Sequence, residues 1–215
     1  MDHFRRSFMQ FSNAHFGLIG ILTVAIYLLT VTLGTILTPG YSNISKDISQ
    51  LTGSGAVARD VLNPLFLLYN IGVVWFGLTL LSRSQKLLPR LASIMVAIIG
   101  ILGALIWLFP INLRGTAATP EGTVHIIIVS IVSLLTVAAT LMFWISFRKS
   151  KAMRQFAIIS LAASLLFFVS GPFAGILVTS PYAGLFERIP IGTFLLWIAC
   201  SSIVLERVPT KASSK

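Results

Sequence analysis

The chain has 215 residues, of which 56% are hydrophobic and only 10% charged, and its mean hydropathy is +0.92. Soluble proteins are about half apolar and a quarter charged, so this composition excludes a soluble globular protein. The formal charge of +10 would suggest nucleic-acid binding in a soluble chain. In a membrane protein it reflects basic residues beside the spans, so we expect no nucleic-acid partner.

Six long apolar stretches follow one another along the chain. Each is bounded by proline, glycine or charged residues, and none carries a charge in its interior. Stretches of about 20 such residues are typical of spanning helices, because the backbone must satisfy its own hydrogen bonds in hydrocarbon. We therefore predict an all-α polytopic membrane bundle of six transmembrane helices within residues 17–205. The stretches are 17–37, 61–81, 91–109, 124–147, 156–178 and 189–205.

The basic residues fall mainly on one side of this predicted bundle. Twelve lysines and arginines lie in the two termini and in the second and fourth connections. By the positive-inside rule, both termini are predicted to be cytoplasmic, in a multi-pass protein of the cell (plasma) membrane. The other connections, predicted to be outer, carry four basic residues: Lys46, Arg59, Arg114 and Arg188.

The terminal segments outside the spans are short and basic. Residues 1–16 carry Phe4, Phe8 and Phe11 at helical spacing, which predicts a cytoplasmic amphipathic segment; the alternative is a disordered tail. Residues 206–215 are predicted to be a cytoplasmic basic tail. In the first outer connection, Ile44, Ile48 and Leu51 recur at helical spacing, which predicts one or two amphipathic turns lying on the outer surface.

Polar residues within or beside the spans are the candidates for function, because they are costly in a bilayer. Asn70, in the second span, either joins neighbouring helices by hydrogen bonds or contributes to a ligand site. The outer ends of the third, fourth and sixth spans bring further polar residues to the same side. They form either an anchor for helix ends or a lipid or ligand pocket, and they are Asn112, Arg114, His125, Ser130, Glu187 and Arg188.

The arginines and the histidine of this cluster would suit a lipid phosphate, or another small anionic headgroup or solute. The sequence lacks the residues that common membrane-protein cofactors require. His15 and His125 lie at opposite ends of the bundle, which argues against a bis-histidine haem. No lysine lies within a span for a retinal Schiff base, and one outer histidine is too few for zinc. We expect no cofactor and no metal and assign no catalytic residue. The sequence leaves open whether the protein is an enzyme but favours that it is not. The one cysteine, Cys200, precludes an intramolecular disulfide.

Four short motifs carry a family resemblance. They are residues 47–51 (DISQL), 107–110 (WLFP), 122–125 (GTVH) and 184–188 (GLFER). In this order, in a chain with six spans, they resemble the prokaryotic membrane proteins grouped as domain of unknown function 998, over essentially the whole chain. Members commonly carry Asp and Glu where this chain has Asn112 and Gln50. A looser similarity to the Frag1, DRAM and Sfk1 group of six-span proteins implies a link to lipid handling.

Three interpretations of function follow. The first is a non-catalytic lipid-binding or membrane-organising protein with a polar cluster at its outer face. The second is a small-solute permease or its accessory subunit. The third is a membrane enzyme acting on an outer-leaflet lipid, with His125 as general base and Glu187 as its partner. Membrane lipids are the expected partners, and the sequence does not indicate an oligomeric state.

Overall fold

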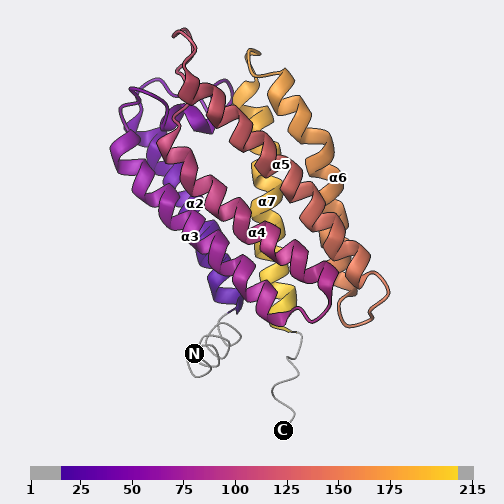
Figure 1. Cartoon of the computed structure of the whole chain (residues 1–215). Helices are drawn as coiled ribbons and strands as arrows, with labels where there is room; N and C mark the ends of the chain where they lie inside the picture. Colours follow the sequence, from indigo (N-terminus) through magenta and orange to yellow (C-terminus); the bar gives the residue numbers. More distant parts are fainter. Residues whose placement is uncertain (1–15, 208–215) are drawn as a thin grey trace.

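The computed structural model describes residues 16–207, and six long helices make up this part of the chain. All six are long and apolar enough to cross a membrane, so the predicted all-α bundle of six spans is confirmed (Figure 1). The predicted segments 1–16 and 206–215 lie almost entirely outside the described residues. The helices are α2 (Phe16–Leu37), α3 (Arg59–Arg83), α4 (Leu87–Leu105), α5 (Pro120–Phe147), α6 (Arg154–Ile176) and α7 (Ala183–Glu206), with two short 3-10 helices, η1 (Ile48–Leu51) and η2 (Ile106–Leu108).

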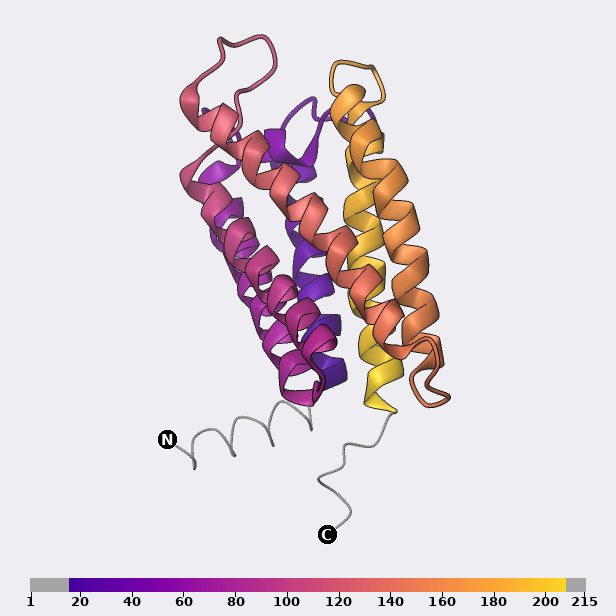
Figure 2. The ribbon, with the colours of Figure 1, turned by 45° about the vertical axis from the view of Figure 1, so that its right-hand side comes forward.

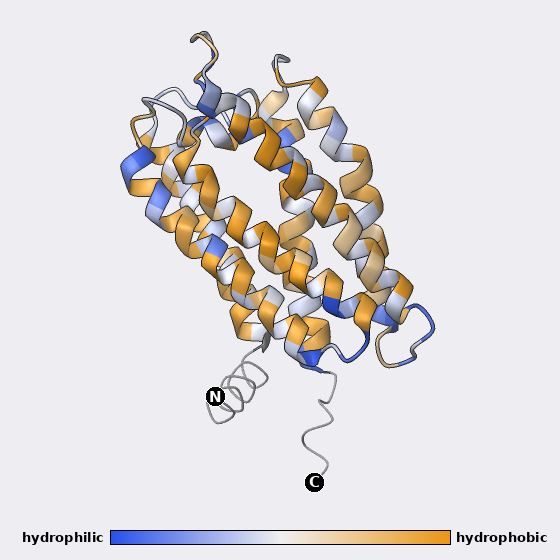
Figure 3. Ribbon diagram, viewed as in Figure 1, coloured by the Kyte–Doolittle hydropathy of each residue, from blue (hydrophilic) through white to orange (hydrophobic). Residues whose placement is uncertain are grey.

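The six helices pack as a ring in chain order. Each helix packs against the next, and α7 packs against α2, which closes the ring (Figure 1 and Figure 2). The two ends of the described chain meet at one end of the bundle, where the Gly17 amide donates a hydrogen bond to Oε2 of Glu206 at 2.6 Å. We call this end the proximal end, and the opposite end, with residues 38–58, 109–119 and 177–182, the distal end. Hydrophobic residues cover the middle of the helices, and hydrophilic ones gather mostly at the two ends (Figure 3).

The observed helices overlap every predicted span, and the largest difference is at the start of α7. The sequence predicts a start at residue 189, after two charged residues, whereas the helix begins at Ala183. Its first turns continue through Glu187 and Arg188 because residues of the first distal connection bind both side chains. The start of α5 is also earlier than predicted. Pro120 occupies the first turn there, and the Thr119 hydroxyl caps the helix.

Glycines allow α3 and α4 to approach closely. A Cβ atom at Gly77 of α3 would lie 2.5 Å from the backbone nitrogen of Ala97 in α4. A Cβ atom at Gly100 of α4 would lie 2.8 Å from the carbonyl oxygen of Asn70 in α3. Small residues at such contacts allow the dispersion contacts that hold membrane helices together where no hydrophobic effect drives their association.

Aromatic side chains fill the half of the ring that is nearer the termini. Trp197 of α7 is 1% exposed, and its ring centroid lies 5.8 Å from that of Phe76 in α3 and 5.9 Å from that of Phe143 in α5. Its indole nitrogen donates a hydrogen bond to the Ser160 hydroxyl of α6 at 3.1 Å. A single side chain on α7 therefore contacts three other helices and fills the interior on this side.

Candidate functional site

The distal half of the ring encloses a cavity of about 720 Å³, within the range of about 300–1,000 Å³ typical of ligand sites. Residues of all six helices and of the first distal connection line it, and most of them are apolar. Phe194 of α7 lines the cavity and stacks on Trp197, with 5.9 Å between the ring centroids. The aromatic layer around Trp197 is therefore the floor of the cavity.

The cavity exists because α5 and α6 diverge toward the distal end. The Ser164 hydroxyl of α6 donates a hydrogen bond to the carbonyl oxygen of Val137 in α5 at 3.2 Å. Beyond this contact α5 lies toward α4, while α6 stays beside α7 (Figure 2). Lining residues on the two separated helices are well exposed: Ile126 and Leu134 of α5 by 58% and 72%, and Phe168 of α6 by 67%. The cavity thus opens sideways between α5 and α6, through an apolar rim.

The first distal connection, residues 38–58, covers the end of the cavity. Leu51 is fully buried and Ile48 is 6% exposed, whereas Ile44 is 55% exposed. The predicted amphipathic turns are thus a single turn, η1, whose apolar side inserts into the bundle instead of resting on its surface.

Arg188 fastens this connection to α7. Its guanidinium donates hydrogen bonds to the Tyr41 hydroxyl at 2.9 Å, to Oδ1 of Asn43 at 2.7 Å and to the carbonyl oxygen of Lys46 at 3.1 Å. It also lies 5.8 Å from the centroid of the Tyr41 ring. Burial raises the pKa of the Tyr41 hydroxyl, so this group keeps its proton and donates to the Asp47 carbonyl oxygen at 2.9 Å. A planar guanidinium with several donors suits such a set of oxygens.

Residues on either side of Arg188 add to this contact. The Glu187 carboxylate accepts a hydrogen bond from the Ile48 amide, at the start of η1. The Leu185 amide donates to the carbonyl oxygen of Ile44 at 3.0 Å. A Cβ atom at Gly184 would collide with the first distal connection, so the close approach requires glycine at this position.

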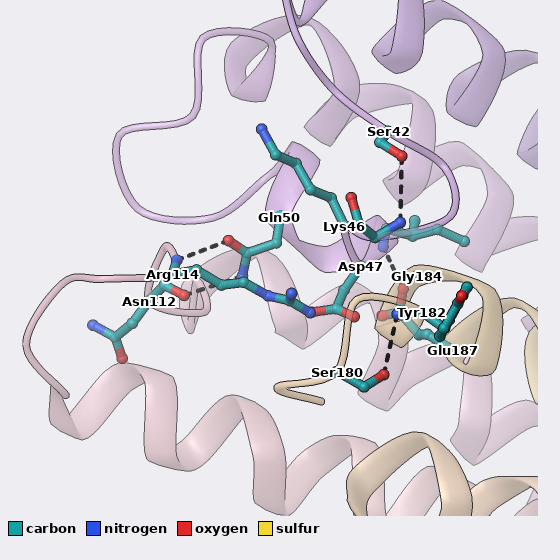
Figure 4. A network of polar contacts seen from close by, with 12 residues as sticks. Ser42, Lys46, Asp47, Gln50, Asn112, Arg114, Ser180, Tyr182, Gly184 and Glu187 are labelled. Atoms are coloured by element: carbon teal, nitrogen blue, oxygen red, sulfur yellow. Dashed lines mark hydrogen bonds and ion pairs between the residues drawn. The ribbon is translucent and has the colours of Figure 1, made fainter. Parts of the chain in front are cut away.

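The third connection, residues 109–119, is joined to the first by a second set of bonds (Figure 4). The Arg114 guanidinium forms an ion pair with Asp47 at 2.9 Å, and its backbone amide donates to Oε1 of Gln50 at 3.0 Å. The Gln50 side-chain amide donates to the carbonyl oxygen of Asn112 at 3.1 Å. The Asn112 side chain binds within its own connection, donating to the Ala117 carbonyl oxygen at 2.9 Å.

The predicted polar residues therefore divide into two groups in the distal half of the bundle. The first group lines the cavity, and a ligand-binding role for it stays a prediction. The second group holds the connections together and does not line the cavity. The first comprises Asn70, His125, Ser130 and Glu187, and the second comprises Asn112, Arg114 and Arg188.

His125 is 4% exposed and is held by the backbone. Its Nδ1 atom lies 2.8 Å from the carbonyl oxygen of Phe109. A carbonyl oxygen only accepts, so Nδ1 carries the proton and, in the neutral ring, Nε2 is an acceptor. Glu187, the partner suggested for an enzyme, binds the Ile48 amide. Within residues 16–207, no group of three His, Cys, Asp or Glu side chains is placed to hold a metal ion.

Asp47 is a cavity-lining residue that was not predicted from the sequence. It is 5% exposed, lines the cavity and pairs with Arg114. Its place in a long polar connection outside the spans gave no sign that it would be buried. The one signal that marked it was its position at the head of the DISQL motif.

A family model described as "Protein of unknown function (DUF998)" matches residues 21–204, which confirms the resemblance carried by the four motifs. No curated protein and no solved structure matches the chain. The similarity to the Frag1, DRAM and Sfk1 group stays a prediction.

Proposed function

The chain belongs to the family described as "Protein of unknown function (DUF998)", and we propose that it is a non-catalytic lipid-binding or membrane-organising protein of the plasma membrane. The observation that carries this proposal is the distal cavity, which is mostly apolar and opens sideways between α5 and α6. In a membrane this opening faces the hydrocarbon. An acyl chain can therefore enter without passing through water, and its polar head then meets the polar residues near η1.

The floor of the cavity argues against the permease alternative. Trp197, Phe76 and Phe143 pack together across the ring between the cavity and the proximal end. A solute path through the bundle would have to displace this layer, which is close-packed and almost fully buried. A site that is open to one side and closed below suits binding better than transport.

The enzyme alternative lacks an assembled pair of catalytic groups. The Nδ1 atom of His125 is bonded to a backbone carbonyl, and the Glu187 carboxylate is bonded to a backbone amide. The suggested base and its suggested partner are thus each oriented by a backbone group and not by each other. We therefore favour binding without chemistry.

Filling the cavity tests the proposal. Ser133→Trp adds an indole to a residue of α5 that lines the cavity, and we expect the amount of lipid that copurifies in mild detergent to fall at least tenfold. Mass spectrometry of lipid extracts measures this amount per protein molecule. Ser146→Trp is the matched control, because Ser146 lies on the same helix outside the cavity lining and is also partly buried. A folded Ser133→Trp variant that keeps its full lipid content would refute the proposal.

The proposed orientation places the distal end outside the cell and both termini in the cytoplasm. In a Cys200→Ala background, we expect Thr116→Cys to react with a membrane-impermeant maleimide on intact cells. Ser150→Cys, in the connection between α5 and α6, should react only after lysis. The physical reason is the excess of lysine and arginine in the proximal connections. The opposite labelling pattern would reverse the orientation.

A further inference from the structure

The charged side chains that line the distal cavity have one sign. Asp47 and Glu187 are both among the lining residues, and both are acidic. No basic side chain of the described distal end lines the cavity, although this end carries Lys46, Arg59, Arg114 and Arg188. Acidic groups in an apolar cavity repel a phosphate or a carboxylate and attract a positive or hydrogen-donating group.

Both carboxylates keep acceptor capacity after their protein contacts are made. Arg114 binds one oxygen of Asp47, and the Ile48 amide donates to one oxygen of Glu187. A carboxyl group has lone pairs on two oxygens, so these contacts do not use all of its acceptor positions. A ligand group that donates hydrogen bonds can therefore bind to them without displacing a protein contact.

The neutral polar groups that line the cavity on α5 are also acceptors. The Ser130 hydroxyl donates to the carbonyl oxygen of Ile126 at 2.8 Å, and the Ser133 hydroxyl donates to that of Val129 at 2.9 Å. A hydroxyl has one proton, so only lone pairs remain to face the cavity. His125 uses its Nδ1 proton on Phe109, which leaves Nε2 as an acceptor.

We propose that the distal cavity selects a lipid whose polar head is a hydroxyl or an ammonium group, and that it disfavours phosphate and carboxylate heads. This inference rests on the proposed lipid-binding function and specifies the class of lipid. The donating head binds beside Asp47 and Glu187, and the acyl chain occupies the apolar part of the cavity near the opening. The sequence-based expectation of an anionic headgroup relied on Arg114 and Arg188, whose guanidiniums bind Asp47 and the first distal connection.

Three lipids with the same chain and different heads test this selectivity. Oleyl alcohol, oleylamine and oleyl phosphate present a hydroxyl, an ammonium and a phosphate on identical hydrocarbon. Binding of each to the full-length protein in detergent is measured by native mass spectrometry at neutral pH. We expect the alcohol and the amine to bind at least tenfold more tightly than the phosphate.

A pair of matched variants tests whether Glu187 is responsible. Glu187→Gln keeps an oxygen for the Ile48 amide but removes the charge and adds two donors. We expect oleylamine to bind at least tenfold more weakly to this variant and the preference over oleyl phosphate to narrow. Glu121→Gln makes the same change in the first turn of α5, outside the cavity lining, and should keep the wild-type ranking. If Glu187→Gln does not fold, the selectivity is tested by the order in which the wild-type protein binds the three lipids. The role of the acidic lining is then tested with Asp47→Asn, for which we also expect weaker oleylamine binding.

The outcomes separate this inference from the function on which it rests. Oleyl phosphate binding as tightly as the alcohol would overturn the selectivity while leaving lipid binding in place. A folded Glu187→Gln variant with the wild-type ranking would overturn the role of the carboxylate. If none of the three lipids binds and Ser133→Trp keeps its lipid content, both the selectivity and the lipid-binding function fail.

Discussion

Replacing Trp197 with alanine is expected to lower the free energy of unfolding by about 3–5 kcal/mol, the cost typical of large aromatic side chains removed from a packed interior. The indole contacts Phe76, Phe143 and Phe156 on three other helices, so its loss leaves a void that none of them can fill alone. The loss also leaves the Ser160 hydroxyl without its donor. Unfolding in mixed micelles with increasing SDS measures the change.

Trp144→Ala is the control for this prediction. Trp144 lies on α5 and is only partly buried, with the Arg148 guanidinium 5.0 Å from its ring centroid. The loss of that cation–π contact is expected to cost about 0.5–1 kcal/mol. Equal destabilisation by the two substitutions would show that the aromatic layer does not hold the ring together.

Replacing Arg188 with alanine is expected to release the first distal connection from α7. The guanidinium donates to Tyr41, Asn43 and the Lys46 carbonyl, and a hydrogen bond from a charged group contributes about 1.5–3 kcal/mol. The protection of the amides in residues 41–52 against hydrogen exchange should therefore fall at least tenfold. Amides in the middle of α3 and α4 should exchange as in the wild type, because the aromatic layer remains intact.

Two further variants make this prediction specific to the guanidinium. Arg188→Lys keeps the positive charge but loses the planar fork, so we expect an intermediate loss of protection. Arg59→Ala removes a basic residue at the start of α3, at the same end of the bundle, and should leave exchange in residues 41–52 unchanged. If Arg188→Ala also leaves it unchanged, Gly184 and Glu187 suffice to hold the connection.

The helices could be predicted from the sequence because the length of an apolar run is a local property. The start of α7 could not, since its charged residues are satisfied by partners far away along the chain. The Ile48 amide binds Glu187, and Tyr41 binds Arg188. Sequence patterns show that such charges are present, but not which distant groups neutralise them.

Some of the residues that line the cavity could be predicted from the sequence, but Asp47 and the shape of the cavity could not. The side of the membrane on which His125 and Glu187 lie follows from counting spans, and both line the cavity. The cavity itself results from the divergence of α5 from α6 beyond Val137, which depends on how the two helices cross. The spacing of apolar residues along a helix does not determine the angle at which two helices cross. Neither the opening of the cavity nor the position of Asp47 in its lining could therefore be inferred from the sequence.

The arrangement of the ring in chain order has a consequence for biosynthesis. Helices enter the membrane from the N-terminus onward, and α7, which is made after α2 to α6, is the element that meets α2 and closes the ring. It also contributes Trp197 to the floor of the cavity and Glu187 to its polar lining, and its Arg188 binds the first distal connection that covers the cavity. A nascent chain or a truncated product without α7 thus has no enclosed binding site. If the proposed function is right, lipid binds only after α7 has joined the ring, and bound lipid then stabilises chains with a closed ring against proteolysis.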